Sequence, residues 1–215
     1  MKRILTGDDR DQLDALIATT ENRTNTQIVL ALIQRSDSYA EIPWKAFGLG
    51  SSTAGLLVFL YDLIFNDWHP LMTMVYTVMI ILGAGAVLTA MTLLLPGFAR
   101  IFLAVHRAET EVRQYAESLF LSRELYATAR RTGILLLVSL FERKVVILPD
   151  KGLNDILTEN QLHSIIREMT PLLHQRAARK AFEAGMEKLS VILENGLTGT
   201  GKNELPDEII EEKGA

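Results

Sequence analysis

The feature that most constrains this chain of 215 residues is a run of 25 residues, Leu71–Leu95, that contains no charged side chain. A second apolar window, Ala46–Phe65, precedes it and contains a single carboxylate. The hydrocarbon core of a bilayer is about 30 Å thick and is crossed by about 20 helical residues. Both windows are long enough. Buried core helices of water-soluble domains seldom contain 25 consecutive residues without a charged side chain. The sequence therefore predicts two transmembrane helices, at 46–65 and 71–95, joined as a tight hairpin.

Basic residues near the two windows predict the orientation of the hairpin. Lys45 comes just before the first window, whereas Arg100, Arg107 and Arg113 follow the second, and the connector contains neither Lys nor Arg. Because cytoplasmic loops carry an excess of basic residues, both termini are expected in the cytoplasm. The N-terminal segment becomes polar by Thr6, so no cleavable signal peptide is expected. These patterns predict a two-span protein of the cell (inner) membrane, with the lipid bilayer as a partner.

Asp62 lies near the outer end of the first window. An ionisable side chain inside a membrane is a functional candidate by default. The alternative is that Asp62 reaches the water interface beside Asp67 of the connector. Small residues in both windows would allow the two helices to pack closely. They are Gly48, Gly50, Ser51, Ser52 and Gly55 in the first window and Gly83, Ala84, Gly85 and Ala86 in the second.

The remaining 165 residues are enough for one α/β domain that the hairpin interrupts. Its two parts are residues 1–45 and 96–194, and residues 195–215 are Gly-rich and then acidic, which predicts a loosely ordered, flexible tail. Three short apolar runs predict strands. The first two are expected to be parallel because a helical crossover separates them, and the third follows a tight turn. The expected fold is a small mixed sheet with helices on both faces, an α/β/α sandwich.

The predicted elements have the following bounds. Strands are expected at Gln27–Ile33, Gly133–Ser139 and Lys144–Leu148, and helices at Asp8–Thr20, within Phe98–Ala129, from Thr158 to about Met169, and from Pro171 to about Glu194. Thr158 and Gln161 fit a capping box, in which the two side chains satisfy exposed backbone amides of the first turn.

Composition and motifs exclude several classes of function. With 22 basic and 26 acidic side chains, the chain has no positive excess for nucleic acid. The absence of Cys excludes disulfides, Cys-ligated zinc and a thiol nucleophile. Residues 196–202 match the phosphate-loop pattern G-x-x-x-x-G-K, but a helix precedes them and Asn203 replaces the magnesium-binding Ser or Thr. No nucleotide or other cofactor is therefore expected.

Three acidic residues, Asp8, Asp9 and Asp11, lie near the start of the first predicted helix. The positive end of a helix dipole favours anionic side chains at such positions. The alternative is that these carboxylates form a metal site. Stabilisation of the helix start is the simpler interpretation and is preferred, so no bound metal is expected.

The segment Arg131–Leu153 reads RTGILLLVSLFERKVVILPDKGL. It resembles the central strand, hairpin and turn of the TPM domain, also called the TPM phosphatase domain. Glu21–Leu30, Tyr115–Phe120 and Thr158–Leu193 are similar to other parts of that family. The resemblance implies an α/β/α sandwich, and it implies phosphatase activity as one function found among its members.

One position differs from the secreted branch of that family, which carries D-[DN]-G before the central strand. This chain has Arg131-Thr132-Gly133 there, and an Arg side chain cannot bind a cation. The chain is more similar to a membrane-embedded branch with an inserted helical hairpin, and metal-dependent phosphatase chemistry is not expected of it.

Two hypotheses follow for the function. In the first, the cytoplasmic TPM-like domain is an interaction or assembly module that contacts other membrane proteins. In the second, it is a phosphatase that hydrolyses phosphomonoesters, with Arg131 binding phosphate and Asp150 assisting. No motif establishes a catalytic residue. The predicted contact surface consists of Arg131, Thr132, Gly133, Glu142, Arg143, Asp150 and Gly152.

Overall fold

In the computed structural model, two apolar strands form the centre of a sheet. β1 (Gln27–Arg35) and β2 (Gly133–Ser139) pair in parallel, with Gln27 opposite Gly133. Both are buried along most of their length, as continuous apolar runs predict for strands that are covered on both faces. β3 (Lys144–Pro149) pairs antiparallel with β2, so the predicted mixed sheet is confirmed.

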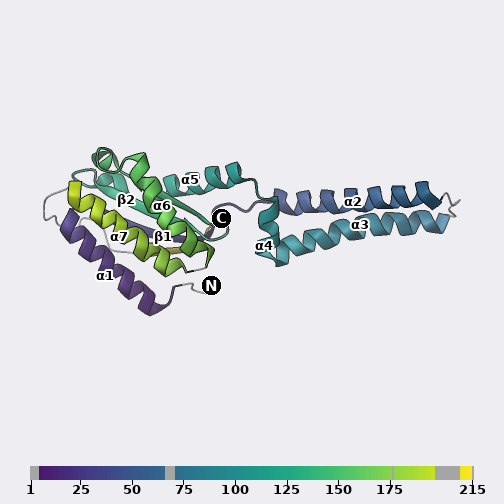
Figure 1. Ribbon diagram of the computed structural model, residues 1–215, viewed down its shortest axis with the longest axis horizontal. Helices are drawn as coiled ribbons and strands as arrows, with labels where there is room; N and C mark the ends of the chain where they lie inside the picture. The colour runs from purple at the N-terminus through teal and green to yellow at the C-terminus, as the bar shows by residue number, and fades with distance from the viewer. Residues whose placement is uncertain (1–4, 66–70, 176, 197–208, 215) are drawn as a thin grey trace. The chain divides into compact units, whose positions relative to one another are not determined.

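The structure describes residues 5–65, 71–175, 177–196 and 209–214 (Figure 1). The chain divides into an α/β unit, made of residues 1–37 and 106–215, and a helical unit, made of residues 38–105. The α/β unit therefore draws on both parts of the chain that flank the helical unit.

A fourth strand, β4 (Ile209–Gly214), pairs in parallel with the other side of β1. The strand order is therefore β3-β2-β1-β4. The sequence predicts a loosely ordered tail over 195–215, and residues 209–214 differ from that expectation because they form a strand. Ile209 and Ile210 are buried in the cores on opposite faces of the sheet, and this burial stabilises a segment that is otherwise polar. Residues 197–208 lie outside the described part of the chain.

Helices cover both faces of the sheet, which confirms the α/β/α arrangement. α1 (Gly7–Thr24), α6 (Glu159–His174) and α7 (Ala178–Gly196) pack on one face, and α5 (Val105–Ser122) packs on the other. Figure 1 shows α1 and α7 side by side. The even-numbered residues 28–32 of β1 enter the first core and the odd-numbered residues 29–33 enter the second. This alternation is the period of two that a strand imposes on its side chains.

The starts of α1 and α6 are both capped by their own side chains. The N–H of Thr6 donates to Asp9 Oδ2 at 2.9 Å, and the hydrogen bonds from Thr6 lower the pKa of Asp9. The N–H of Thr158 donates to Gln161 Oε1 at 2.8 Å, as the sequence predicts. Asp9 therefore acts as a capping residue of α1, and it also pairs with Arg179 of α7 at 3.2 Å.

The predicted helix break at Pro171 is wrong. α6 continues through Pro171 to His174, and α7 starts at Ala178. Proline in a helix removes the hydrogen bond to the carbonyl four residues earlier, which here belongs to Arg167. Pro171 and Arg167 are both exposed, so the helix loses this bond on its solvent side while Leu173 remains buried.

The region predicted to be helical over 98–129 is divided into several pieces. α4 (Pro96–Ala99) and the 3-10 turn η1 (Arg100–Phe102) belong to the helical unit, α5 follows, and a second 3-10 turn, η2 (Leu125–Ala127), precedes β2. Glu124 adopts a left-handed conformation between α5 and η2, with φ of 53°, and so redirects the chain toward β2.

Two long apolar helices, α2 (Glu41–Phe65) and α3 (Leu71–Leu94), dominate the helical unit and lie side by side (Figure 1). They approach closely at Gly50 and Gly85. A Cβ on Gly50 would lie 2.8 Å from the carbonyl oxygen of Ala84, and a Cβ on Gly85 would lie 2.4 Å from Oγ of Ser51. Small residues thus permit this contact, as the sequence predicts, and both helices are long and apolar enough to cross a membrane.

Candidate functional site

The seven residues of the predicted contact surface occupy both ends of β2. Five of them lie where β2 starts and β3 ends, and these five are called the Arg131 cluster: Arg131, Thr132, Gly133, Asp150 and Gly152. Glu142 and Arg143 lie in the turn at the other end. A strand of this length separates its ends by roughly 20 Å, so the structure brings the first five together and separates them from the other two.

The backbone of the Arg131 cluster is tightly constrained. Arg131 has φ of 58°, and its N–H donates to the carbonyl of Thr128 at 3.0 Å. The N–H of Gly152 donates to the carbonyl of Arg131 at 2.9 Å. A Cβ at position 152 would lie 2.4 Å from the carbonyl oxygen of Arg130, so only glycine fits there without a backbone shift.

Arg131 and Asp150, the proposed phosphatase pair, are in contact. Nε of Arg131 lies 2.9 Å from Oδ2 of Asp150, and the contact is an ion pair without hydrogen-bond geometry. The other oxygen, Oδ1, accepts the N–H of Lys151 at 2.7 Å. The Asp150 side chain is only 4% exposed, whereas that of Arg131 is 45% exposed and its guanidinium lies 5.8 Å from the ring centre of Tyr126. The guanidinium can therefore meet an external anion, while the carboxylate is held inside.

Thr132 and Gly133 connect the start of β2 to the end of α1 and to η2. The hydroxyl of Thr132 donates to the carbonyl of Asn25 at 3.2 Å, and its N–H donates to Oγ1 of Thr128 at 3.0 Å. A Cβ on Gly133 would lie 2.2 Å from the carbonyl oxygen of Leu125. These two residues hold the backbone in place and present no free polar group to a ligand.

Glu142 links the turn between β2 and β3 to the end of β1. Its Oε1 accepts the N–H of Ser36 at 2.9 Å and the hydroxyl of Ser36 at 2.8 Å, and its Oε2 accepts the hydroxyl of Ser139. Glu142 is 8% exposed and Ser139 is fully buried, so this cluster is closed to a substrate. Ser139 thus has a carboxylate partner that its isolated position in the sequence does not reveal.

Other charged residues near this end of the sheet contact α5 and α6. Arg143 lies 3.2 Å from Nδ1 of His174, and Arg107 donates to Asp37 at 3.0 Å. Lys144 donates to Glu109 at 2.7 Å, and this hydrogen bond lowers the pKa of the Glu109 carboxyl. Asp37 and Arg107 lie where the chain leaves and re-enters the α/β unit, so their ion pair joins the two connections to the helical unit.

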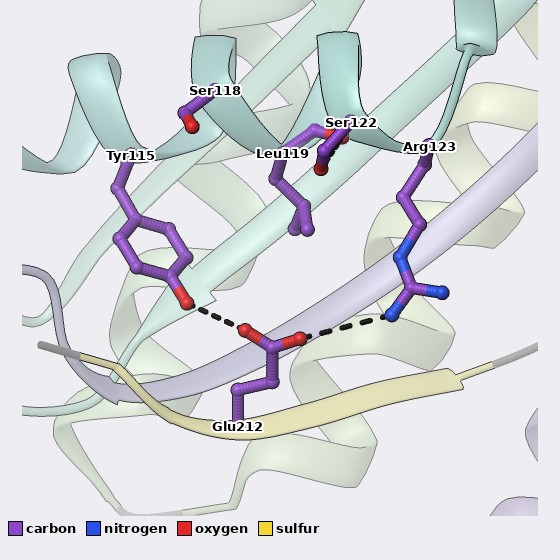
Figure 2. A pocket seen from close by; sticks show the side chains of 6 residues that line it. All are labelled: Tyr115, Ser118, Leu119, Ser122, Arg123 and Glu212. Carbon is purple, nitrogen blue, oxygen red and sulfur yellow. Dashed lines mark hydrogen bonds and ion pairs between the residues drawn. The ribbon is translucent and has the colours of Figure 1, made fainter.

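A pocket of about 430 Å³ lies between α5 and β4. Figure 2 shows Tyr115 of α5 and Arg123, the residue after α5 ends, both pointing toward Glu212 of β4. The Tyr115 hydroxyl donates to Oε2 of Glu212 at 2.7 Å, and Arg123 lies 3.7 Å from Oε1. Burial of the side chain is the main cause that raises the pKa of Tyr115, and the hydrogen bond to Glu212 is the second cause. The phenol therefore keeps its proton and remains a hydrogen-bond donor. The sequence does not single out Glu212 as a candidate. The one pattern that indicates a strand there is the pair of β-branched isoleucines just before the two glutamates.

Asp62 lies on α2, three residues before the helix ends at Phe65, and it is partly exposed. Asp67, its suggested neighbour, lies outside the described residues. Within the described ranges, His, Asp and Glu side chains do not gather in groups of three or more that could hold a metal ion.

Comparisons with known proteins agree with this fold. The NMR structure of the BA42 protein from the psychrophilic bacterium Bizionia argentinensis superimposes with a TM-score of 0.59 at 14% sequence identity, covering 98% of this chain and 97% of that one. At this identity the likeness shows the fold alone. No match was found among the curated proteins. The family model of the TPM domain matches residues 98–192, from the end of the helical unit to the last turns of α7. The chain therefore contains a TPM domain over residues 98–192.

Proposed function

We propose that this chain is an integral membrane protein in which α2 and α3 cross the bilayer as a hairpin. The observation that carries the proposal is the apolar surface of these two helices. Leu57, Ile64 and Leu94 are between 62% and 78% exposed, and they are part of a much larger apolar surface along both helices. Water-soluble monomers do not expose apolar patches of this size, whereas a bilayer would cover them.

Thr89 and the helical backbone of the hairpin are compatible with a bilayer. The hydroxyl of Thr89 donates to the carbonyl of Gly85 at 2.9 Å, within its own helix. Backbone groups within both helices are paired by helical hydrogen bonds, which is what a lipid environment requires. Lys45 lies near the start of α2 and Arg100 shortly after the end of α3, at the helix ends that connect to the α/β unit in sequence, which supports a cytoplasmic location for that unit.

The α/β unit, in this proposal, is an interaction or assembly module for other membrane proteins. The polar residues of the Arg131 cluster are mostly engaged in internal contacts, which favours a structural role over catalysis. Oδ1 of Asp150 accepts the N–H of Lys151 and Oδ2 is in an ion pair with Arg131, so the carboxylate would have to leave Arg131 to assist a reaction. The exposed guanidinium of Arg131 remains available to a partner's carboxylate or phosphate.

The alternative is hydrolysis of phosphomonoesters, which the TPM resemblance suggests. In that case Arg131 would bind the phosphate and Asp150 would assist, and both Arg131→Ala and Asp150→Asn would abolish activity of the purified protein toward a general phosphomonoester. Activity that survives both changes would exclude this pair as the catalytic site.

The topology can be tested directly because the chain contains no Cys. Single-Cys variants Asp67→Cys, in the connector, and His163→Cys, on the exposed side of α6, are treated with a membrane-impermeant maleimide in intact cells. We expect labelling at position 67 in intact cells, and labelling at position 163 only after permeabilisation. Labelling of both positions in intact cells would disprove the cytoplasmic orientation, and release of the protein by alkaline carbonate would disprove membrane integration.

A further inference from the structure

The chain turns sharply where α3 ends. Leu95 is extended, with φ of −119° and ψ of 96°, and Pro96 starts α4. Proline has no N–H and so cannot continue the hydrogen bonds of α3, but it suits the first turn of a new helix. Figure 1 shows that α4 runs across the ends of α2 and α3 rather than along them. A segment that crosses the ends of two transmembrane helices lies in the plane of the membrane surface.

The segment formed by α4 and η1, residues 96–102, has a covered side and an exposed side. Ala99 is buried, and the rings of Phe98 and Phe102 pack edge to face with their centres 5.5 Å apart. Ile101, in contrast, is 73% exposed. This side chain follows directly on the exposed apolar end of α3, so the apolar surface of the hairpin continues onto the turn.

The start of α2 brings an aromatic and a basic side chain to the same end of the hairpin. Residues 46–65 of α2 span about 30 Å, at about 1.5 Å per residue, which is the thickness of the hydrocarbon core. Trp44 and Lys45 therefore lie at its boundary. Trp44 is 75% exposed, and tryptophan is enriched at that depth because its ring is apolar and its N–H is polar.

Two cations lie beside these exposed apolar side chains. Nζ of Lys45 donates to the carbonyl of Phe102 at 3.5 Å, so Lys45 lies against the turn that contains Arg100. Oε1 of Glu41 lies 4.0 Å from the same Nζ, and the Lys45 side chain is 46% exposed. An ammonium has three N–H donors and a guanidinium has five, so both cations can bind phosphate oxygens in addition to their contacts within the chain.

We infer that the base of the hairpin, formed by Trp44, Lys45 and residues 96–102, is a phospholipid-binding surface. α4 and η1 lie in the headgroup layer, with the side chains of Trp44 and Ile101 in the upper acyl region. Lys45 and Arg100 bind the headgroup phosphates. The inference rests on the proposed membrane crossing and goes beyond it, because the crossing alone would allow residues 96–102 to lie in water.

Spin-label depth measurements test this placement in the full-length protein, because the chain contains no Cys. Single-Cys variants Ile101→Cys, Leu82→Cys on α3 and His163→Cys on α6, all at exposed positions, are labelled with a nitroxide. The proteins are reconstituted into vesicles of phosphatidylethanolamine and phosphatidylglycerol. Collisions with oxygen and with a water-soluble nickel complex give the depth of each label. We expect position 82 in the hydrocarbon core, position 163 in water, and position 101 roughly 5–10 Å below the phosphates.

The outcomes separate this inference from the membrane proposal. If the label at position 82 lies in hydrocarbon while the label at position 101 meets nickel as often as the label at position 163, the lipid-binding surface is disproved and the crossing stands. If the label at position 82 is itself exposed to nickel, the crossing is disproved and the inference fails with it.

Removal of the two positive charges tests phosphate binding. Lys45→Gln with Arg100→Gln in the Ile101→Cys chain should raise the nickel collision rate at position 101 at least about twofold, because the turn is held less firmly at the headgroups. The same pair in the Leu82→Cys chain should leave position 82 unchanged. Arg113→Gln with Lys188→Gln removes two exposed charges of the α/β unit and should change neither label. An unchanged collision rate at position 101 in the Lys45 and Arg100 variant would overturn the assignment of phosphate binding to them.

Discussion

The two edge strands of the sheet are held in place in different ways. β3 follows β2 after a turn of four residues, and Glu142 in that turn accepts hydrogen bonds from Ser36 and Ser139. β4 reaches the opposite edge after a long connection and depends on Arg10, Tyr115 and Arg123, which belong to other elements. One edge is therefore stabilised mainly by a local hairpin, and the other by contacts between segments far apart in the sequence.

The largest expected effect concerns the β3 edge. Glu142→Ala leaves the N–H of Ser36 and two buried hydroxyls without their acceptor. Hydrogen bonds to a charged group contribute about 1.5–3 kcal/mol each, and Glu142 accepts three of them, so we expect the free energy of unfolding to fall by about 4 kcal/mol or more. Chemical denaturation followed by far-ultraviolet circular dichroism measures it. Glu142→Gln keeps one acceptor oxygen and should lose clearly less, and equal losses in the two variants would show that the carboxylate is not the stabilising group.

A matched pair of core substitutions distinguishes the two edges. Ile147 of β3 and Ile210 of β4 are both buried, and Ile→Ala in a core costs about 2–5 kcal/mol. We expect Ile147→Ala to lower the stability of the whole α/β unit, because β3 is part of the central hairpin. Ile210→Ala should mainly increase hydrogen exchange at β4 and along the β1 edge, because β4 can leave without separating β1, β2 and β3.

Native-state hydrogen exchange measured by mass spectrometry separates these outcomes. If Ile210→Ala lowers protection in β2 and β3 as much as Ile147→Ala does, then β4 unfolds together with the rest of the sheet, and the two edges are equivalent.

The smallest expected effects are opposite pH dependences at the two edges. The pKa of Glu109, which pairs with Lys144 of β3, lies below the ordinary value of 4.5. Its contribution to stability is therefore present above pH 4.5 and is lost as the pH falls through the lowered pKa. The pKa of Tyr115, which binds Glu212 of β4, lies above the ordinary value of 10.0. Its contribution is present below pH 10 and is lost as the pH rises through the raised pKa.

Denaturation midpoints measured as a function of pH test both predicted pH dependences of stability. Glu109→Gln should flatten the acid side of the curve and leave the alkaline side unchanged, whereas Tyr115→Phe should do the reverse. An alkaline side that is the same in Tyr115→Phe and in the unmodified chain would show that the Tyr115–Glu212 contact contributes nothing to β4.

The same contrast explains which elements the sequence predicts. β1, β2 and β3 are continuous apolar runs whose partners are indicated by a crossover or a tight turn, so local patterns predict them with their pairing. β4 has only two apolar residues, and its stability comes from Arg10, Arg123 and Tyr115, whose proximity no local pattern reveals. Pro171 shows the reverse error, because a strong local signal for a helix start is outweighed by the burial of Leu173.

The candidate site was predicted in part for the same reason. The resemblance pairs Arg131 with Asp150, and the structure places Nε of Arg131 2.9 Å from Oδ2 of Asp150 because the antiparallel hairpin brings the start of β2 to the end of β3. The predicted contact surface also includes Glu142 and Arg143, although the hairpin turn lies at the opposite end of β2. The predicted topology, applied to these residues, would have separated the two groups.

The position of the helical unit in the chain limits how many times the inserted segment can cross a membrane. This unit is inserted within the connection from β1 to β2, and those two strands lie side by side in one sheet. The points where the chain leaves and re-enters the sheet must then lie on the same side of a bilayer. The inserted segment can therefore cross the bilayer only an even number of times. A single crossing, by α2 or by α3 alone, is incompatible with the pairing of β1 and β2 in one sheet.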